Sequence, residues 1–206
     1  VPADGDLNGA TLAWVKDTGG VLSDTSHIAV TQWDLGSGSW LSPVELNAYL
    51  DNDQAMNHQV SVDRKEYAGG ETYNALAWTA DEDGDLSTPD DRYISLATEG
   101  TLFGQPFWFA GVLTETEGLP AGVDAPSIGM IDPQTNSYER LDLAFLKRGG
   151  VTLDGDTVDL GQVSNQAEVW MMSKYPGEGW LGGPMADGSG DSVGGEAPQV
   201  FVSDAT

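Results

Sequence analysis

The sequence of residues 76–91 reads Leu-Ala-Trp-Thr-Ala-Asp-Glu-Asp-Gly-Asp-Leu-Ser-Thr-Pro-Asp-Asp. Its first three residues are apolar and predict the end of a buried strand. The loop that follows carries five aspartates around Gly84. Carboxylates this close repel one another unless a cation or open water lies between them, because the Coulomb energy grows as the separation shrinks. A strand end and a ligand site are therefore expected side by side.

Calcium binds six to eight oxygens in a flexible loop, and alternating aspartates with a glycine at the sharp turn can supply them. We expect a calcium site formed by Asp81, Asp83, Asp85 and Asp90. The spacing is not that of an EF-hand, because Gly84 comes between the second and third aspartates and no glutamate stands at the twelfth position. An acidic, solvated hairpin loop without an ion is an equal alternative in a chain that is acidic throughout.

The net charge excludes one class of partner. The 206 residues contain 8 Lys and Arg against 33 Asp and Glu, which gives a net charge of -25. Such a surface repels a phosphate backbone, so nucleic acid is not an expected partner. A hydrophobic content of 39% with 7 Trp is too high for a disordered acidic tail. The charge then belongs to the surface of a folded protein, and a saline or calcium-rich setting would screen it.

Other compositional features favour a secreted or cell-surface β-rich domain. The sequence has no cysteine, so it holds no disulfide and no thiolate site, and this does not decide the compartment. Its 27 Gly and 10 Pro separate short apolar runs, as in chains made of strands and turns. No apolar run is long enough to cross a membrane as a helix, so membrane insertion is not expected.

An internal repeat is the strongest signal in the sequence. The apolar triplet Leu-Ala-Trp occurs at residues 12–14 and 76–78, and Leu-Ala-Phe occurs at residues 143–145. A glycine-rich turn ending in an aromatic follows each triplet, at Trp40, Phe103 and Trp180. Short strands ending in Asp precede the second and third triplets, and a further one stands at residues 200–204 with nothing after it. The chain is thus one repeat domain with units at residues 1–44, 58–108 and 125–185, and residues 197–206 supply the missing first strand of the first unit.

Each unit contains four short strands, which is the content of a β-propeller blade. We therefore predict an all-β fold of about three blades, with Trp14, Trp78 and Phe145 packed between neighbouring blades. The segment from Val44 to Met56 alone has a weakly helical pattern. Propellers need roughly 4 to 8 blades. The ring is either incomplete or completed by other chains or copies of this chain, and we expect an oligomer in which the last strand completes the partner's first blade.

Residues 173–180, Ser-Lys-Tyr-Pro-Gly-Glu-Gly-Trp, resemble the Asp-box (BNR repeat) of sialidase-like propellers, Ser-x-Asp-x-Gly-x-Thr-Trp. Tyr175 stands in the Asp place and Gly179 in the Thr place, and residues 34–40 look like the same turn with one residue more. The resemblance implies a propeller fold. Sialidases of this family also use three arginines and a Tyr and Glu pair, but none of the four arginines here lies in a matching context, so no catalytic residue is carried over.

Two functions follow from these features. The first is an extracellular, cation-stabilised propeller module that binds a glycan or a protein, or serves structural surface assembly, without catalysis. The alternative is a carbohydrate-active hydrolase of the sialidase-like or glycosidase type, with Trp33, Trp108 or Tyr175 stacking on sugar. We favour the first, because 33 acids supply a carboxylate pair by chance and the two histidines are isolated.

Overall fold

The computed structural model describes residues 10–17, 26–46, 56–66, 72–85, 91–102, 105–113, 122–131, 140–148, 151–153, 156–158, 167–185 and 198–199. In these residues the backbone is almost entirely extended, so the prediction of an all-β protein is confirmed. None of them forms a helix long and apolar enough to cross a membrane. The strands are β1 (Thr11–Asp17), β2 (Ser26–Asp34), β3 (Ser39–Trp40), β4 (Val44–Leu46), β5 (Met56–Glu66), β6 (Thr72–Asp81), β7 (Arg92–Leu102), β8 (Gln105–Leu113), β9 (Val123–Ile131), β10 (Arg140–Lys147), β11 (Val151–Leu153), β12 (Asp156–Val158), β13 (Glu168–Lys174) and β14 (Trp180–Pro184).

The helix expected from Val44 is wrong where the structure describes it. Val44, Glu45 and Leu46 form β4, which pairs antiparallel with β2. Leu46 is buried in the core, while Val44 and Glu45 are exposed. Cross-strand pairing with Ile28 and Val30 therefore overrides the weak helical pattern.

The strands form an eight-stranded sheet, a four-stranded sheet and a small hairpin. The first has the order β1-β2-β5-β6-β7-β8, with β3 and β4 attached to β2. The second has the order β14-β13-β10-β9, and β11 pairs with β12. These described strands do not close into a barrel or a ring.

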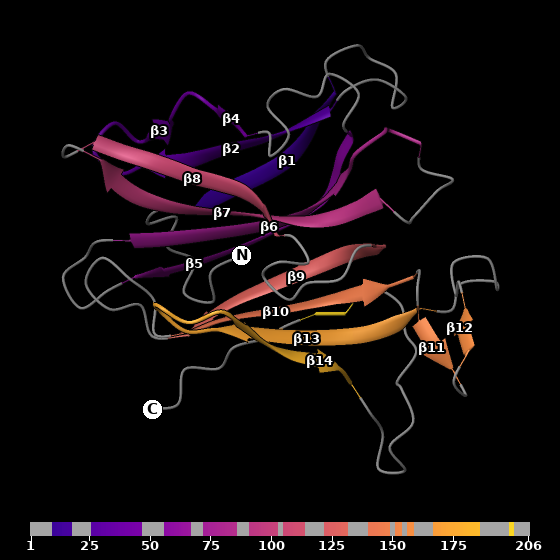
Figure 1. The fold of residues 1–206 in the computed structure, drawn as a ribbon. Helices are drawn as coiled ribbons and strands as arrows, with labels where there is room; N and C mark the ends of the chain where they lie inside the picture. Colours follow the sequence, from indigo (N-terminus) through magenta and orange to yellow (C-terminus); the bar gives the residue numbers. More distant parts are fainter. Residues whose placement is uncertain are drawn as a thin grey trace.

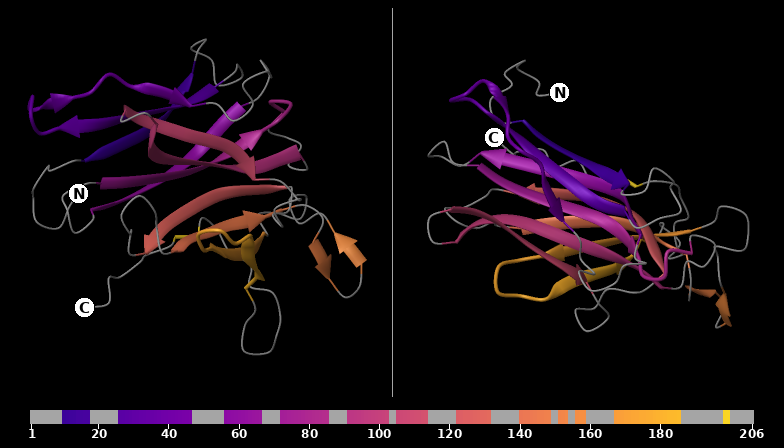
Figure 2. Two further views of the ribbon diagram at one scale, coloured as in Figure 1. Left: turned by 60° about the vertical axis from the view of Figure 1, so that its left-hand side comes forward. Right: turned by 90° about the horizontal axis from the view of Figure 1, so that it is seen from above.

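The eight-stranded sheet is folded over on itself, which gives three stacked layers. Its two parts, β1 to β4 and β5 to β8, join through a single parallel bridge between Ser26 and Met56. The first part lies over one face of β6, and the four-stranded sheet covers the other face (Figure 1). Two further views show the same order of layers (Figure 2).

Strand β6 holds the three layers together because it is buried on both faces. Its alternate residues Leu76 and Trp78 pack against Ile28 and Val30 of β2 in the upper core. Ala75 and Ala77 point the other way into the lower core. That core includes Phe145 and Leu143 of β10, together with Ile94, Val123, Ile128, Met130 and Leu141. The period-2 alternation of a strand thus serves two cores at once.

Strands β5 and β9 meet without forming a backbone ladder. Side chains of β5 accept hydrogen bonds from the backbone amides of β9. Ala125 N donates to Gln59 Oε1 over 2.7 Å, and Ile128 N donates to Ser61 Oγ over 3.2 Å. Met130 N donates to Asp63 Oδ2 over 2.7 Å. These bonds satisfy amides on the outer edge of the lower sheet that would otherwise be unpaired.

The aromatic residues of the first and second triplets occupy different environments. Trp78 is fully buried, and its indole N–H donates to Asn57 Oδ1 over 2.7 Å. Trp14 on β1 is only partly buried, and its neighbour Leu12 is 50% exposed. Layer β1 to β4 covers Trp78, whereas no described layer covers the outer face of β1.

We expect Trp78→Phe to lower the free energy of unfolding by about 1–3 kcal/mol, because it leaves the buried Asn57 carbonyl without its donor. The matched change Trp14→Phe should alter it by less than about 0.5 kcal/mol. Urea denaturation followed by tryptophan fluorescence and circular dichroism measures both. Equal losses in the two variants would contradict the difference in packing described above.

Candidate functional site

The acidic loop brings three carboxylates together where β6 ends and β7 begins. Asp81 is the last residue of β6 and pairs with Arg92, the first residue of β7. Asp91 directly precedes Arg92, and Asp83 lies in the loop between the strands. One carboxylate oxygen from each of Asp81, Asp83 and Asp91 lies within 4.8 Å of the others. Two oxygens bound to one calcium ion at 2.3–2.6 Å are at most about 5 Å apart, so the spacing suits a shared ion.

Backbone amides shape this loop around the carboxylates. Gly84 N donates to Asp81 Oδ1 over 2.9 Å, and Asp83 N donates to Asp91 Oδ2 over 3.1 Å. Asp85 N donates to Asp83 Oδ1 over 2.7 Å. Gly84 has a φ of 75°, in the left-handed region that glycine adopts at no steric cost. The turn thus needs a glycine at this position to fold the aspartates towards one another.

One oxygen of the cluster has no partner. Asp91 Oδ1 is buried and accepts no hydrogen bond from the residues that the structure describes. A buried carboxylate oxygen in this state carries its full desolvation penalty. A cation or a bound water at the cluster would remove that penalty, so the donor set fits a hard cation that prefers oxygen ligands.

A chain of charges connects Asp81 to the lower sheet. Arg92 Nε donates to Asp81 Oδ2 over 3.0 Å, and its Nη1 donates to Asp124 Oδ2 over 3.2 Å. Arg148 Nε donates to the same Asp124 oxygen over 2.5 Å. Asp81, Arg92 and Asp124 are all buried. The loop is therefore fixed to both the middle and the lower layers through hydrogen-bonded ion pairs.

The surroundings of the cluster disfavour its charge. Burial raises the pKa of Asp81, while the Arg92 guanidinium acts in the opposite direction. Burial also raises the pKa of Asp91, and the neighbouring Asp81 carboxylate adds to the effect. Both shifts mean that burying these two carboxylates in their charged form, as folding at neutral pH requires, costs free energy. A bound cation would offset this cost.

The structure places two of the four predicted calcium ligands in the cluster. Asp81 and Asp83 lie in the cluster. Asp85 is exposed, and its backbone amide binds Asp83. Asp90 lies outside the described residues. Asp91 belongs to the cluster although we did not predict it as a ligand; its position just before β7, opposite the end of β6, is the sequence signal that could have indicated it.

The three predicted stacking residues are dispersed over the layers. Trp33 of β2 contacts the ring of Trp40 edge-on, with centroids 5.5 Å apart. Trp108 of β8 packs against the upper core. Tyr175 follows β13 in the lower layer and is 40% exposed.

Arg92, Arg140 and Arg148 bind aspartates inside the protein. Arg92 and Arg148 share Asp124, and Arg140 Nη2 donates to Asp142 Oδ2 over 2.8 Å. Asp142 and Asp124 are both buried. These three arginines therefore neutralise buried carboxylates of the fold.

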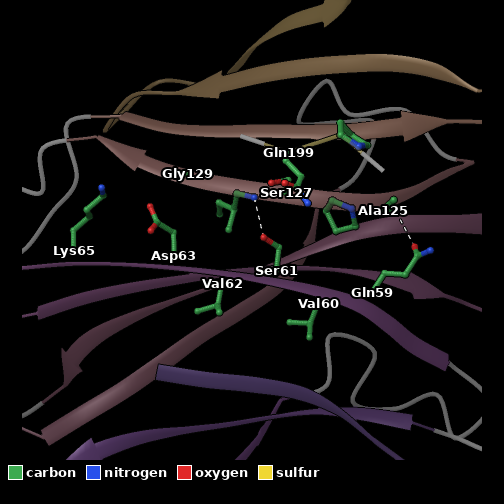
Figure 3. A pocket seen from close by; sticks show the side chains of 13 residues that line it. Gln59, Val60, Ser61, Val62, Asp63, Lys65, Ala125, Ser127, Gly129 and Gln199 are labelled. Atoms are coloured by element: carbon green, nitrogen blue, oxygen red, sulfur yellow. Dashed lines mark hydrogen bonds between the residues drawn. The ribbon is translucent and has the colours of Figure 1, made fainter. Parts of the chain in front are cut away.

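A groove of about 600 Å³ runs between β5 and β9. Gln59, Ser61, Asp63 and Lys65 point from β5 towards β9, whereas Val60 and Val62 point away towards the upper core (Figure 3). Pro198 and Gln199 also line this groove. It is polar along β5 and lies at the junction of the middle and lower layers.

No known protein-family model matches the chain, and no curated protein matches it in sequence.

His58 gives the fold a pH dependence that can be separated from the cluster. Its Nε2 is buried and has no hydrogen-bond partner in the described part of the chain. Burial, with a smaller effect of Arg92, lowers the pKa of His58 from 6.5 to about 4. Because the folded pKa lies below the unfolded one, the stabilisation is full above pH 6.5 and is lost as the pH falls towards 4.

We expect the stability of the wild type relative to His58→Gln to fall by about 2 kcal/mol between pH 7.5 and pH 5, because only the unfolded wild type gains the proton. Denaturant titrations of both proteins across this range measure the difference. A constant difference between wild type and His58→Gln would contradict a buried neutral imidazole.

We expect Asp91→Asn to raise the free energy of unfolding by up to about 1 kcal/mol at pH 7 in chelator, because the neutral amide removes the repulsion of Asp81 and the cost of burying a charge. Glu82→Gln removes a charge from the same loop outside the cluster and should change it by less than about 0.5 kcal/mol. Thermal and urea unfolding in EDTA provide the measurement. A destabilised Asp91→Asn would show that the carboxylate is needed without a cation.

Proposed function

We propose that the protein is a cation-stabilised β-propeller module that binds a glycan or protein, or serves structural surface assembly, and is not an enzyme. The observation that carries the proposal is the cluster of Asp81, Asp83 and Asp91 beside the buried Arg92. Its carboxylates are held at the spacing of a shared ion, in surroundings that penalise their charge. Calcium is the cation we propose.

The propeller part of the proposal is supported by the stacking of the strands. Strands β5 to β8 and β9, β10, β13 and β14 each form an antiparallel set of four, in the order in which they occur along the chain. The triplets at residues 12–14, 76–78 and 143–145 lie in β1, β6 and β10, and β6 and β10 each direct an aromatic into the layer before it. Stacked sheets of this kind cover one another's faces, as the blades of a propeller do.

The setting we propose is the outside of the cell, either as a secreted or a surface protein. A net charge of -25 makes copies of the chain repel one another, and salt or divalent cations reduce this repulsion. Calcium for the acidic loop would be available outside the cell. The assembly role further requires that the module contact other chains or copies of itself.

We expect 10 mM calcium to raise the melting temperature by about 5–10 °C over EDTA at pH 7.5, since a ligand at 100 times its Kd contributes about 2.7 kcal/mol. The increase should shrink as the pH approaches the raised pKa values of Asp81 and Asp91, because protons compete for the oxygens. Differential scanning calorimetry measures the shift, and isothermal titration gives the stoichiometry.

The variant Asp83→Asn tests whether the shift comes from this loop. It removes a cluster ligand that is exposed, and it should abolish most of the calcium effect while the protein stays folded in EDTA. Glu82→Gln should retain the full effect. An unchanged melting temperature of the wild type after chelation would refute the cation-stabilised module.

A further inference from the structure

Strand β8 is an edge strand that carries no protective charge. It is the last strand of the eight-stranded sheet and, in the part of the chain that the structure describes, pairs only with β7 (Figure 1). Its residues, Gln-Pro-Phe-Trp-Phe-Ala-Gly-Val-Leu, include no charged side chain, whereas every other described strand of seven residues or more includes at least one. Charges on an edge strand keep other strands from pairing with it. A long edge without them is suited to pairing.

The exposed side chains of β8 are aromatic or small. Phe107 and Phe109 lie on the face directed towards the lower sheet and are 44% and 52% exposed. Their ring centroids are 4.9 Å apart. Ala110 and Gly111 are exposed as well, and no described atom lies within 4 Å of the place where a Cβ on Gly111 would stand. Two large apolar rings and an open space therefore occur together on this edge strand.

An aromatic ring already packs over a glycine between β7 and β8. Gly100 of β7 lies opposite Phe107, and the ring of Phe109 leans over it from the next position on the same face. A Cβ at Gly100 would stand 2.8 Å from Phe109 Cε2, closer than real side chains approach. A glycine on one strand thus supplies the space that a ring from the neighbouring strand occupies.

The order of large and small residues along β8 is complementary to itself. When a twofold axis relates two identical antiparallel strands, residues equally far from the axis lie opposite each other. Phe109 is the middle residue of Gln105–Leu113, so an axis at Phe109 pairs the whole strand. The opposite pairs are then Phe107 with Gly111 and Trp108 with Ala110. A large ring is opposite a small residue on both faces of the sheet.

We propose that β8 pairs antiparallel with β8 of a second copy of the chain, with Phe109 on the twofold axis. An axis at Trp108 would set Phe107 opposite Phe109, and an axis at Ala110 would set Trp108 opposite Val112. Either shift brings two large side chains against each other. The pairing names the contact of the assembly role, and it rests on that part of the proposed function.

Charge and complementarity favour a second copy over an unrelated strand. In a twofold pair, a charged residue near the axis faces its own copy, and like charges directly opposite each other are destabilising. A chain of net charge -25 therefore needs an uncharged contact between copies, and β8 provides one. The small residues required opposite Phe107 and Trp108 are also present in β8 itself. Because the same edge serves both copies, the pairing closes at a dimer.

Single cysteines test the contact and its register, because the chain contains no cysteine of its own. Phe109→Cys places a thiol opposite its own copy, where Cα atoms are about 4.5–5.5 Å apart and suit a disulfide. Under mild oxidation it should give a disulfide-linked dimer on a non-reducing gel. Phe107→Cys is the matched control on the same face. Its two copies would be four residues apart along the strands, about 13 Å, and should give little dimer.

The variant Gly111→Lys tests the pairing while it leaves every aromatic residue in place. In analytical ultracentrifugation at about 0.15 M salt, which screens charges beyond about 8 Å, the wild type should sediment as a dimer. Gly111→Lys should raise the dissociation constant of the dimer by at least about tenfold, because it fills the space for Phe107 of the second copy and charges the edge. Gly183→Lys on the edge strand β14, where an added Cβ also meets no described atom, should leave the dimer unchanged.

Each outcome decides the proposal. A linked dimer from Phe109→Cys and not from Phe107→Cys, with dissociation by Gly111→Lys alone, supports it. A wild-type monomer, or equal yields from the two cysteine variants, would overturn it. A dimer that resists both lysine variants would place the contact elsewhere and overturn the β8 pairing. The contact expected from the sequence at residues 200–204 lies outside the described residues.

The calcium response separates this inference from the proposed cation site. The acidic loop lies between β6 and β7, so Gly111→Lys should retain the calcium-dependent rise in melting temperature. A wild-type dimer with no calcium response would refute the cation site and leave the β8 pairing intact. A wild-type monomer that still responds to calcium would refute the pairing alone.

Discussion

The burial of β6 on both faces is the constraint on which the rest of the structure depends. A single sheet with apolar residues on both sides cannot cover itself, so it needs a layer above and a layer below. Leu76 and Trp78 pack against β2, and Ala75 and Ala77 pack against β10. The small alanines let the bulky Phe145 of the next layer approach closely. The stacking order of the layers follows from this alternation of large and small residues along one strand.

Polar contacts, in addition to apolar packing, hold the layers together. Edge strands of β-proteins expose amides, and here β5 satisfies those of β9 with the side chains of Gln59, Ser61 and Asp63. Gln59 adopts a φ of 55° at a bulge in β5, a conformation uncommon outside glycine, and its Oε1 also accepts from Thr79. Irregular backbone is thus present at the junction of two layers, where it directs a side chain across the gap.

The acidic loop is connected to the same framework. Arg92 lies between Asp81 at the loop and Asp124 on β9, and its guanidinium pairs with both carboxylates. A change in the charge of the loop therefore acts on the same side chain that joins the middle and lower layers. Breaking one partner of a buried pair leaves the other charge uncompensated, at a cost of several kcal/mol. For this reason cation binding at the loop is expected to act on the stability of the stacked layers and not only on the loop itself.

The sequence by itself determined the all-β class, the strand at Leu76 and the acidic loop after it, because alternation of apolar residues and the positions of Gly and Asp are local properties. Only the tertiary structure decided that Asp91 joins Asp81 and Asp83, since that proximity comes from the pairing of β6 with β7. It also decided that Val44 to Leu46 form a strand, and that the side chains of β5 bind the amides of β9. Contacts between residues more than 60 positions apart depend on how the layers stack, and no local pattern of residues encodes that distance.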